Sequence, residues 1–338
     1  MDLSVLAGIS PARNSNHNGR VAENNDAAGG VDLQQTRHMQ IEEYPPYEEN
    51  GRWYHGFRRG MYMYPCDDAE QERLDIFHKL FSVARFDTLT SAPLNLPPGP
   101  GERGPRILDL GCGTGIWAIE MARRYKDAYV LGIDLAPIQP PNPPYNCEFQ
   151  VPRDFEGLWT LGENSWDLIH LQMGCGSVSS WPNLYKKVFR HLRPGGYFEQ
   201  VEINFEPHSD HYVPTEEPLY QWYYQLKAAT SYAGKPIAFN RNTPRMLEEA
   251  GFEDVKPQLI ELPLNSWRDD PHEKEVGKWY NLAFSESATT LLQGPLTRVC
   301  NWPLSQIQQL ADAAVSQAYN KNVHVWHHMH IFTARKPG

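Results

Sequence analysis

The chain has 338 residues, of which 41% are hydrophobic, and this is enough to fill the core of one large domain or two modest ones. A formal net charge of −10, from 41 acidic and 31 basic residues, argues against a general nucleic-acid binder, because such proteins usually present a basic face. No apolar run approaches the roughly 18 residues of a membrane span and the N-terminus lacks the pattern of a signal peptide, so we expect an intracellular protein with no membrane segment.

The first hundred residues precede the main domain and have two parts. Residues 1–45 are rich in Asn, Gly, Ala, Asp and Gln without hydrophobic periodicity, which predicts a disordered tail. Residues 46–100 begin with an aromatic segment, and Asp67 or Asp68 is the expected N-cap of a helix whose apolar residues recur at helical spacing. The stretch PLNLPPGPGERGP, residues 93–105, is too rich in proline and glycine for a helix or strand and is interpreted as a linker.

Residues 101–338 alternate strand and helix patterns, which is typical of a parallel sheet with crossover helices. The expected strands lie in RILDLG, YVLGIDL, NCEFQV, SWDLIHLQM, YFEQVEINFEP, FEDVKPQLIEL and VHVWHHMHIFTARKP. The expected helices include GIWAIEMARRY, PNLYKKVFRHLRPGG with a stop at its glycines, TPRMLEEAG and LSQIQQLADAAVSQAYN. We therefore predict an α/β fold with a mostly parallel, seven-stranded sheet flanked by helices and preceded by an N-terminal helical extension.

This alternation breaks at about residues 207–240. The segment is interpreted as an insertion over the carboxyl ends of the strands, where ligands bind in open sheets of this kind. The candidate ligand site therefore lies beneath this insertion.

A glycine-rich turn, GCGTGIW at residues 111–117, joins the strand RILDL to its following helix. Such turns bind dinucleotides, nucleoside triphosphates or other adenosine ligands, so the turn alone leaves the ligand open. No Gly-Lys-Ser/Thr follows it, which argues against a P-loop, and the spacing of Gly111, Gly113 and Gly115 does not fit the dinucleotide pattern G-x-G-x-x-G.

Acidic residues at two strand ends favour a cationic adenosine ligand. Asp109, two residues before the first glycine, would attract a sulfonium or ammonium group, whereas it would repel a phosphate. Asp134 ends the next strand and is placed to accept hydrogen bonds from both hydroxyls of a ribose. Asp154 and Phe155 are expected to bind the adenine amino group and pack on its ring, with a solvated turn as the alternative. This combination predicts S-adenosylmethionine as the ligand.

These motifs resemble those of class I S-adenosylmethionine-dependent methyltransferases and, more narrowly, of the fungal LaeA-like regulators of secondary metabolism. The resemblance covers about residue 50 to the C-terminus, and its narrower part is carried by YHGFRRGMYMYPCDDAEQERLDIFHKLF and HLQMGCGSVSSWPNLY. It implies a Rossmann-like methyltransferase that acts in the nucleus, with the cytoplasm as a second location. It also implies a complex with velvet-domain proteins that controls gene clusters and development, without direct contact to nucleic acid.

The turn, the strand ends and the resemblance together define a set of candidate cofactor-binding residues. Three tyrosines of the N-terminal segment, Tyr54, Tyr62 and Tyr64, are interpreted as a lid over the methionine end of the cofactor, because aromatic faces attract cations. Packing under the following helix is the alternative for these rings. The candidate set consists of Asp109, Gly111, Cys112, Gly113, Gly115, Asp134, Leu135, Asp154, Phe155, Gln172, Met173, Tyr54 and Tyr64.

The methyl acceptor and any catalytic base stay open. Methyl transfer from a sulfonium needs an oriented acceptor and the exclusion of water, and a general base only where the acceptor is protonated at the working pH. The candidates for such a group are His170, Cys175 and Glu202, with a core histidine and a loop thiol as alternatives for the first two. A protein acceptor is the first hypothesis. A cofactor-binding scaffold in a velvet-protein complex and a small-molecule methyltransferase are the alternatives.

No metal site is expected. The five cysteines form no CxxC pair. His324, His327, His328 and His330 lie close in sequence, but on a strand His327 would face away from the others, and no cysteine or carboxylate is near them. The basic pairs at 58–59 and 123–124 are interpreted as solvated charges.

Overall fold

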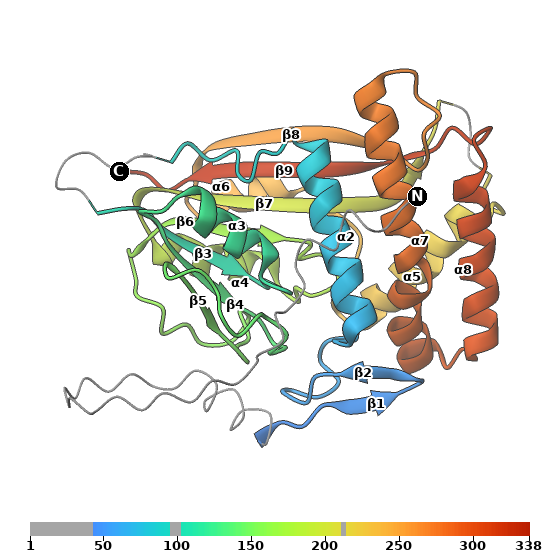
Figure 1. Ribbon diagram of the computed structural model, residues 1–338, viewed down its shortest axis with the longest axis horizontal. Coiled ribbons are helices and arrows are strands. Elements are labelled where there is room, and N and C mark those ends of the chain that lie inside the picture. The colour runs from blue at the N-terminus through green and yellow to red at the C-terminus, as the bar shows by residue number, and fades with distance from the viewer. Residues whose placement is uncertain (1–42, 95–102, 211–213) are drawn as a thin grey trace, which may run out of the picture.

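The computed structural model describes residues 43–94, 103–210 and 214–338 (Figure 1). The tail predicted over residues 1–45 lies outside the described residues up to residue 42, and so does the central part of the predicted linker, residues 95–102. None of the helices in the described ranges combines the length and the apolar character needed to cross a membrane.

A seven-stranded sheet forms the centre of the fold, as the alternating pattern predicts. Its strand order is β5-β4-β3-β6-β7-β9-β8. Strands β3 to β7 run parallel, whereas β9 runs antiparallel to its two neighbours, so the prediction of a mostly parallel sheet is confirmed. The strands are β3 (Arg106–Leu110), β4 (Tyr129–Ile133), β5 (Cys147–Gln150), β6 (Trp166–Gln172), β7 (Leu192–His208), β8 (Glu253–Pro263) and β9 (Trp326–Arg335).

Helices pack on this sheet and beside it. Helix α3 packs against β4 and β5, α4 against β7, and α6 against β8. A second group stands together at one end of the sheet, where α7 contacts α2, α5 and α8 (Figure 1). The helices are α2 (Asp68–Ala84), α3 (Ile116–Arg124), α4 (Trp181–His191), α5 (Pro218–Tyr232), α6 (Thr243–Glu249), α7 (Pro271–Cys300) and α8 (Leu304–Tyr319).

The N-terminal segment forms a hairpin and a helix that join this second group. Strands β1 (Tyr47–Glu49) and β2 (Arg52–Tyr54) pair antiparallel. The predicted N-cap of α2 is confirmed, because the Asp67 side chain accepts a hydrogen bond of 3.1 Å from the backbone N–H of Glu70. Arg52 donates both to Asp67 and, at 2.9 Å, to Thr290 of α7, so the N-terminal hairpin is held against α7.

Helix α7 was missed by the sequence patterns, as were α5 and the hairpin of β1 and β2. It is 30 residues long and buried on most sides, so it lacks the amphipathic period from which a surface helix is recognised. Its Gly294–Pro295 pair resembles a turn, yet Gly294 is required for packing, because an added Cβ would lie 2.0 Å from the carbonyl oxygen of Met63.

Two predicted boundaries were wrong. Helix α4 ends at His191 and not at the glycines of RPGG, which lie inside β7. Leu192 is already extended, and Arg193 precedes a proline, which disfavours helical backbone there. The insertion predicted over 207–240 starts inside β7, and its helix α5 packs on α7 and α8 as part of a larger helical group.

Candidate functional site

A cavity lies at the carboxyl ends of β3, β4 and β6, where the glycine-rich turn begins. Gly111, Gly113 and Gly115 all have positive φ angles, of 68°, 55° and 79°, which glycine adopts without steric cost. The N–H groups of Gly111 and Cys112 both donate to the carbonyl of Ile133 at the end of β4, at 2.9 and 3.0 Å. The turn is thus fixed to the neighbouring strand and presents bare backbone to the cavity.

Gly115 belongs to the turn but not to the cavity wall. An added Cβ there would lie 2.4 Å from the ring of Phe149, so this glycine is needed for packing between α3 and β5. Its place in the candidate cofactor set is therefore corrected. Gly111, Cys112 and Gly113 do line the cavity.

Asp134 stands at the end of β4, beside the turn, as its place in the sequence predicts. Its two carboxylate oxygens accept hydrogen bonds from the N–H groups of Gly113 at 2.8 Å and of Ala136 at 2.9 Å. Burial raises its pKa to about 6, and the backbone donors counteract part of that increase. Asp134 and its neighbour Leu135 both line the cavity.

Asp109 and His170 occupy paired positions on β3 and β6 and face each other in the cavity wall. The Nδ1 atom of His170 lies 2.9 Å from the Oδ1 atom of Asp109. The imidazole ring stacks on the indole of Trp117, with 3.7 Å between ring centroids. His170 is completely buried, so the core histidine considered from the sequence is one that also fixes the cavity carboxylate.

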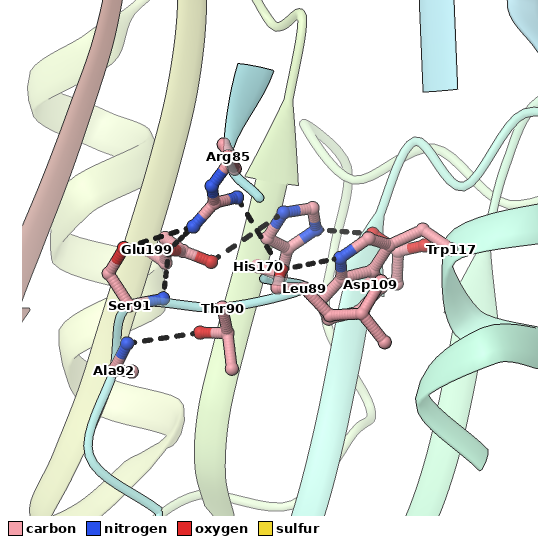
Figure 2. Close-up of polar contacts among 9 residues, drawn as sticks. All are labelled: Arg85, Leu89, Thr90, Ser91, Ala92, Asp109, Trp117, His170 and Glu199. Carbon is pink, nitrogen blue, oxygen red and sulfur yellow. Dashed lines mark hydrogen bonds and ion pairs between the residues drawn. The ribbon is translucent and has the colours of Figure 1, made fainter. Parts of the chain in front are cut away.

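A chain of buried polar side chains continues behind this pair (Figure 2). The Nε2 atom of His170 lies 3.9 Å from the Oε2 atom of Glu199 on β7. The guanidinium of Arg85, just after α2, contacts the other oxygen of Glu199 at 2.6 Å, and the N–H of Ser91 donates to that oxygen at 2.7 Å. The segment after α2 is therefore connected through Glu199 and His170 to the carboxylate that faces the cavity.

Asp154 and Phe155 line the cavity beyond β5. Asp154 is not simply a solvated turn residue, because it forms an ion pair with Arg58 of the N-terminal segment. The ring of Phe155 lies 3.4 Å from the Cβ position of Gly111 and forms one side of the cavity. Arg58 is exposed, as predicted, but it also lines the cavity and pairs with Asp154.

The loop after β6 supplies another wall of the cavity through Gln172, Met173 and Cys175. Burial and the nearby carboxylate of Glu202 raise the pKa of the Cys175 thiol well above its ordinary value, so it stays protonated at neutral pH. Glu202 does not line the cavity, because both of its oxygens face the backbone of the loop, on Gly174 and Cys175. Neither residue is therefore arranged as a nucleophile or a base.

The three tyrosines of the proposed lid separate into two groups. Tyr62 and Tyr64 line the cavity, and the buried hydroxyl of Tyr64 has no hydrogen-bond partner among the described residues. Tyr54 lies outside the cavity, where its ring stacks on Tyr47 and lies 4.6 Å below the guanidinium of Arg298. Its assignment to the cofactor is therefore corrected: the hairpin holds Tyr54 against α7.

Further wall residues come from parts of the chain that sequence motifs did not assign to the site. Helix α2 contributes Leu74, Phe77 and His78. Their helical spacing predicted that α2 covers something apolar, but not that this was the cavity. Other wall residues include Leu291 of α7, and Lys235 and Ile237, which lie after α5 in the segment predicted to cover the site.

The histidines near β9 pack with aromatic rings. His327 is buried and its Nδ1 atom lies 2.5 Å from the Tyr280 hydroxyl, whereas His330 stacks on Phe239 and His324 on Trp267. Within residues 43–94, 103–210 and 214–338, no group of three or more His, Cys, Asp or Glu side chains is arranged to hold a metal ion.

Comparison with known proteins gives one family match and several long relatives. Residues 81–256 match the family model described as a methyltransferase domain. The chain is 54% identical to the secondary metabolism regulator laeA of Aspergillus fumigatus, over 92% of this chain and 82% of that protein. It is 58% identical to a protein of Emericella nidulans named protein-methionine methyltransferase laeA, over 86% of this chain and 76% of that protein.

Among solved structures, one similar chain is phosphoethanolamine N-methyltransferase 2 of Haemonchus contortus in complex with S-adenosyl-L-methionine. It is 18% identical with a TM-score of 0.44, and the match covers 79% of this chain and 57% of that chain.

Proposed function

This chain belongs to the LaeA family of methyltransferases, and from that premise we propose that it transfers a methyl group from S-adenosylmethionine to methionine side chains of proteins, and so regulates secondary metabolism. The observation that carries the proposal is the meeting of the glycine-rich turn, Asp109 and Asp134 in one cavity.

The residues of the cavity fit S-adenosylmethionine. Gly111 and Gly113 form a cradle without side chains, and the unpartnered hydroxyl of Tyr64 is a buried polar group that a ligand can satisfy. Asp134 would hold the ribose, and Asp109 would attract the charged methionine end. When bound, the cofactor supplies a methyl group that is already activated by its sulfonium.

A thioether acceptor fits the groups that surround the cavity. The thioether sulfur of a methionine side chain carries no proton, so its methylation needs an oriented acceptor and the exclusion of water but no base. The Nδ1 atom of His170 contacts Asp109 and its Nε2 atom faces the buried Glu199, while Cys175 remains a neutral thiol, so neither is set up to deprotonate an acceptor. The apolar wall formed by Phe77 and Leu291 would exclude water around the acceptor.

The acceptor is tested by incubating the full-length protein with methyl-deuterated S-adenosylmethionine and a fungal nuclear extract. Mass spectrometry of the digested proteins is expected to place the label on methionine sulfur. The Asp134→Ala variant provides the control with strongly weakened cofactor binding. Label on lysine or arginine, or only on small molecules, would contradict the thioether acceptor. No label on any molecule would favour the scaffold hypothesis.

We extend the proposal to a nuclear location and to a complex with velvet-domain proteins, which the resemblance to LaeA implies. The net charge of −10 is consistent with a role that needs no direct contact with nucleic acid. Purification of the tagged chain from nuclei should recover velvet-domain proteins in stoichiometric amounts. Their absence from a preparation that still binds cofactor would count against the complex.

The affinity for S-adenosylmethionine should depend on the ionisation of Asp134. Because burial raises the pKa of this carboxyl to about 6, it is ionised above that pH and able to accept from both ribose hydroxyls. We expect a constant affinity between pH 7 and 8, and a decrease of up to about tenfold per pH unit below 6. Calorimetric titrations across this range measure it. The Asp134→Asn variant should bind more weakly and show no such step.

A further inference from the structure

The loop Met173–Gly176 follows β6, and its residues Met173, Gly174 and Cys175 line the cavity. In the strand order, Asp134 follows β4 and Asp154 follows β5, whereas this loop follows β6, on the opposite side of β3. A cofactor whose adenosine end lies at the two aspartates therefore directs its methyl end towards β6.

The loop Met173–Gly176 has an unusual backbone conformation that contacts with other parts of the fold must stabilise. Met173 and Gly176 have positive φ angles, of 59° and 84°, and Met173 is a residue for which this conformation is uncommon. Gly174 is closely surrounded, since an added Cβ would lie 2.9 Å from both Leu171 and Trp181. A sharp turn with a non-glycine residue at positive φ persists only where neighbouring groups fix it.

Glu202 of β7 provides that support. Its side chain is completely buried, and its Oε1 and Oε2 atoms accept hydrogen bonds from the N–H groups of Gly174 at 3.1 Å and of Cys175 at 3.0 Å. Gln200 donates to Oε1 at 3.0 Å, and the hydroxyl of Tyr185 donates to Gln200 at 2.8 Å. The carboxylate is thus fixed on one side by a polar network and binds the loop on the other.

We propose that Glu202 is a positioning residue for methyl transfer, whose carboxylate holds the loop Met173–Gly176 in the shape that receives the acceptor. The proposal rests on the proposed function, because it concerns the acceptor side of the same cavity. It assigns to Glu202 a role different from the base considered from the sequence, since Glu202 reaches the site through the backbone N–H groups of Gly174 and Cys175 and through the Cys175 thiol.

The charge of Glu202 changes near neutral pH, while its titratable neighbours keep theirs. Burial raises the pKa of Glu202 to about 7, although the loop donors favour the carboxylate. The pKa values of Cys175 and Tyr185 are also raised by burial, so both stay neutral. His330, opposite Glu202 on β9, has a pKa lowered to about 4 by burial and is neutral as well.

Protonation of Glu202 weakens its hold on the loop. A carboxyl group with a proton on one oxygen can no longer accept equally well at both oxygens, so one of the two loop hydrogen bonds is lost or lengthened. Glu202 therefore stabilises the loop most strongly above pH 7, and this stabilisation weakens as the pH falls through 7.

The stability of the fold changes in the opposite direction. Because the pKa of Glu202 is higher in the folded chain than its ordinary value of 4.5, the folded chain binds more protons between pH 4.5 and 7. The stability that Glu202 contributes is complete below pH 4.5 and is lost as the pH rises through 7. Stability alone therefore does not require a carboxylate here, since an amide of the same shape avoids the buried charge.

The test compares the full-length protein with Glu202→Gln and with Glu206→Gln as a matched control. Glu206 lies on the same strand, and its side chain pairs with the exposed Arg241 at 3.3 Å. Three quantities are measured from pH 6 to 8.5: the affinity for S-adenosylmethionine, amide hydrogen exchange in the peptide covering residues 170–180, and methyl transfer into a fungal nuclear extract.

At pH 8 we expect Glu202→Gln to transfer methyl groups about tenfold more slowly and to exchange the loop amides about tenfold faster, as for the loss of one charge-assisted hydrogen bond. Cofactor affinity should change less than about twofold. As the pH falls to 6, the transfer rate and the loop exchange of the unmodified protein should approach those of Glu202→Gln. The variant itself should show no step at pH 7 in either quantity. Glu206→Gln should match the unmodified protein.

Each contrary outcome has a separate meaning. Equal transfer by Glu202→Gln and the unmodified protein, or a loop exchange profile without a step at pH 7, would overturn the positioning role while leaving the methyltransferase proposal intact. An equal loss of cofactor affinity and transfer would reduce Glu202 to a structural residue. No transfer by the unmodified protein, despite cofactor binding, would overturn the proposed function and this inference with it.

Discussion

Asp134→Ala is expected to weaken the binding of S-adenosylmethionine by about a hundredfold or more. Two ribose hydroxyls lose a charged acceptor, and a hydrogen bond to a charged group contributes about 1.5–3 kcal/mol. The substitution also removes the acceptor of the Gly113 N–H, which lies 2.8 Å from the carboxylate and helps to fix the turn. Calorimetric titration at pH 7.5 measures the loss.

Two further variants make this result specific. Asp134→Asn keeps the shape and one carbonyl oxygen, so it should bind more tightly than Asp134→Ala but more weakly than the unmodified protein. Glu163→Ala, at an exposed glutamate outside the cavity, should leave the affinity unchanged. If Asp134→Ala folds and binds S-adenosylmethionine with normal affinity, the ribose is held elsewhere and the assignment of the cavity fails.

Arg85→Met should lower the free energy of unfolding by about 3–5 kcal/mol. The guanidinium and the carboxylate of Glu199 are both almost completely buried, with side-chain exposures of 4% and 0%. Removing only the cation leaves a buried carboxylate without its counter-ion, which is costly because the protein interior solvates a charge poorly. Urea denaturation followed by circular dichroism gives the change directly.

The double variant Arg85→Met/Glu199→Gln distinguishes two contributions to the loss of stability: the loss of the ion pair itself and the presence of an unpaired buried charge. Glutamine keeps the size of Glu199 and can still accept from the N–H of Ser91, so the double variant should recover about half of the lost stability. If it is as unstable as Arg85→Met alone, the cost comes from the lost packing of the arginine and not from an unpaired carboxylate.

Much of the cofactor side of the cavity could be predicted from the sequence because its residues are local to strand ends. Asp109, the glycine-rich turn and Asp134 each follow directly from a recognisable buried strand, and parallel strands bring their carboxyl ends to one edge. Their relative positions therefore depend only on the sheet being recognised. Asp154 and Phe155 follow the same logic after β5.

The rest of the site depends on packing between distant segments, which sequence patterns do not carry. No sequence pattern around Arg58 predicts its ion pair with Asp154, which forms only because the fold places the two residues together. Tyr54 and Tyr64 are alike in sequence, and only the hairpin decides that one ring meets α7 and the other the cavity. Leu291 was missed because α7 has no surface period from which to recognise it.

The cavity is closed by segments that lie far apart in the sequence. Arg52 and Thr290 are 238 positions apart in sequence and are hydrogen-bonded at 2.9 Å, and Leu291 follows in the cavity wall. The chain must therefore close a very long loop before the cavity has all of its walls, and such contacts form slowly because their loop entropy is large. Competence to bind cofactor should thus be a late event in folding.

A fragment limited to residues 81–256, the range of the family match, would lack Arg58, most of α2 and all of α7. Cofactor binding then indicates that the fold is completely assembled, since the cofactor stabilises only the form in which the N-terminal segment and α7 are in contact.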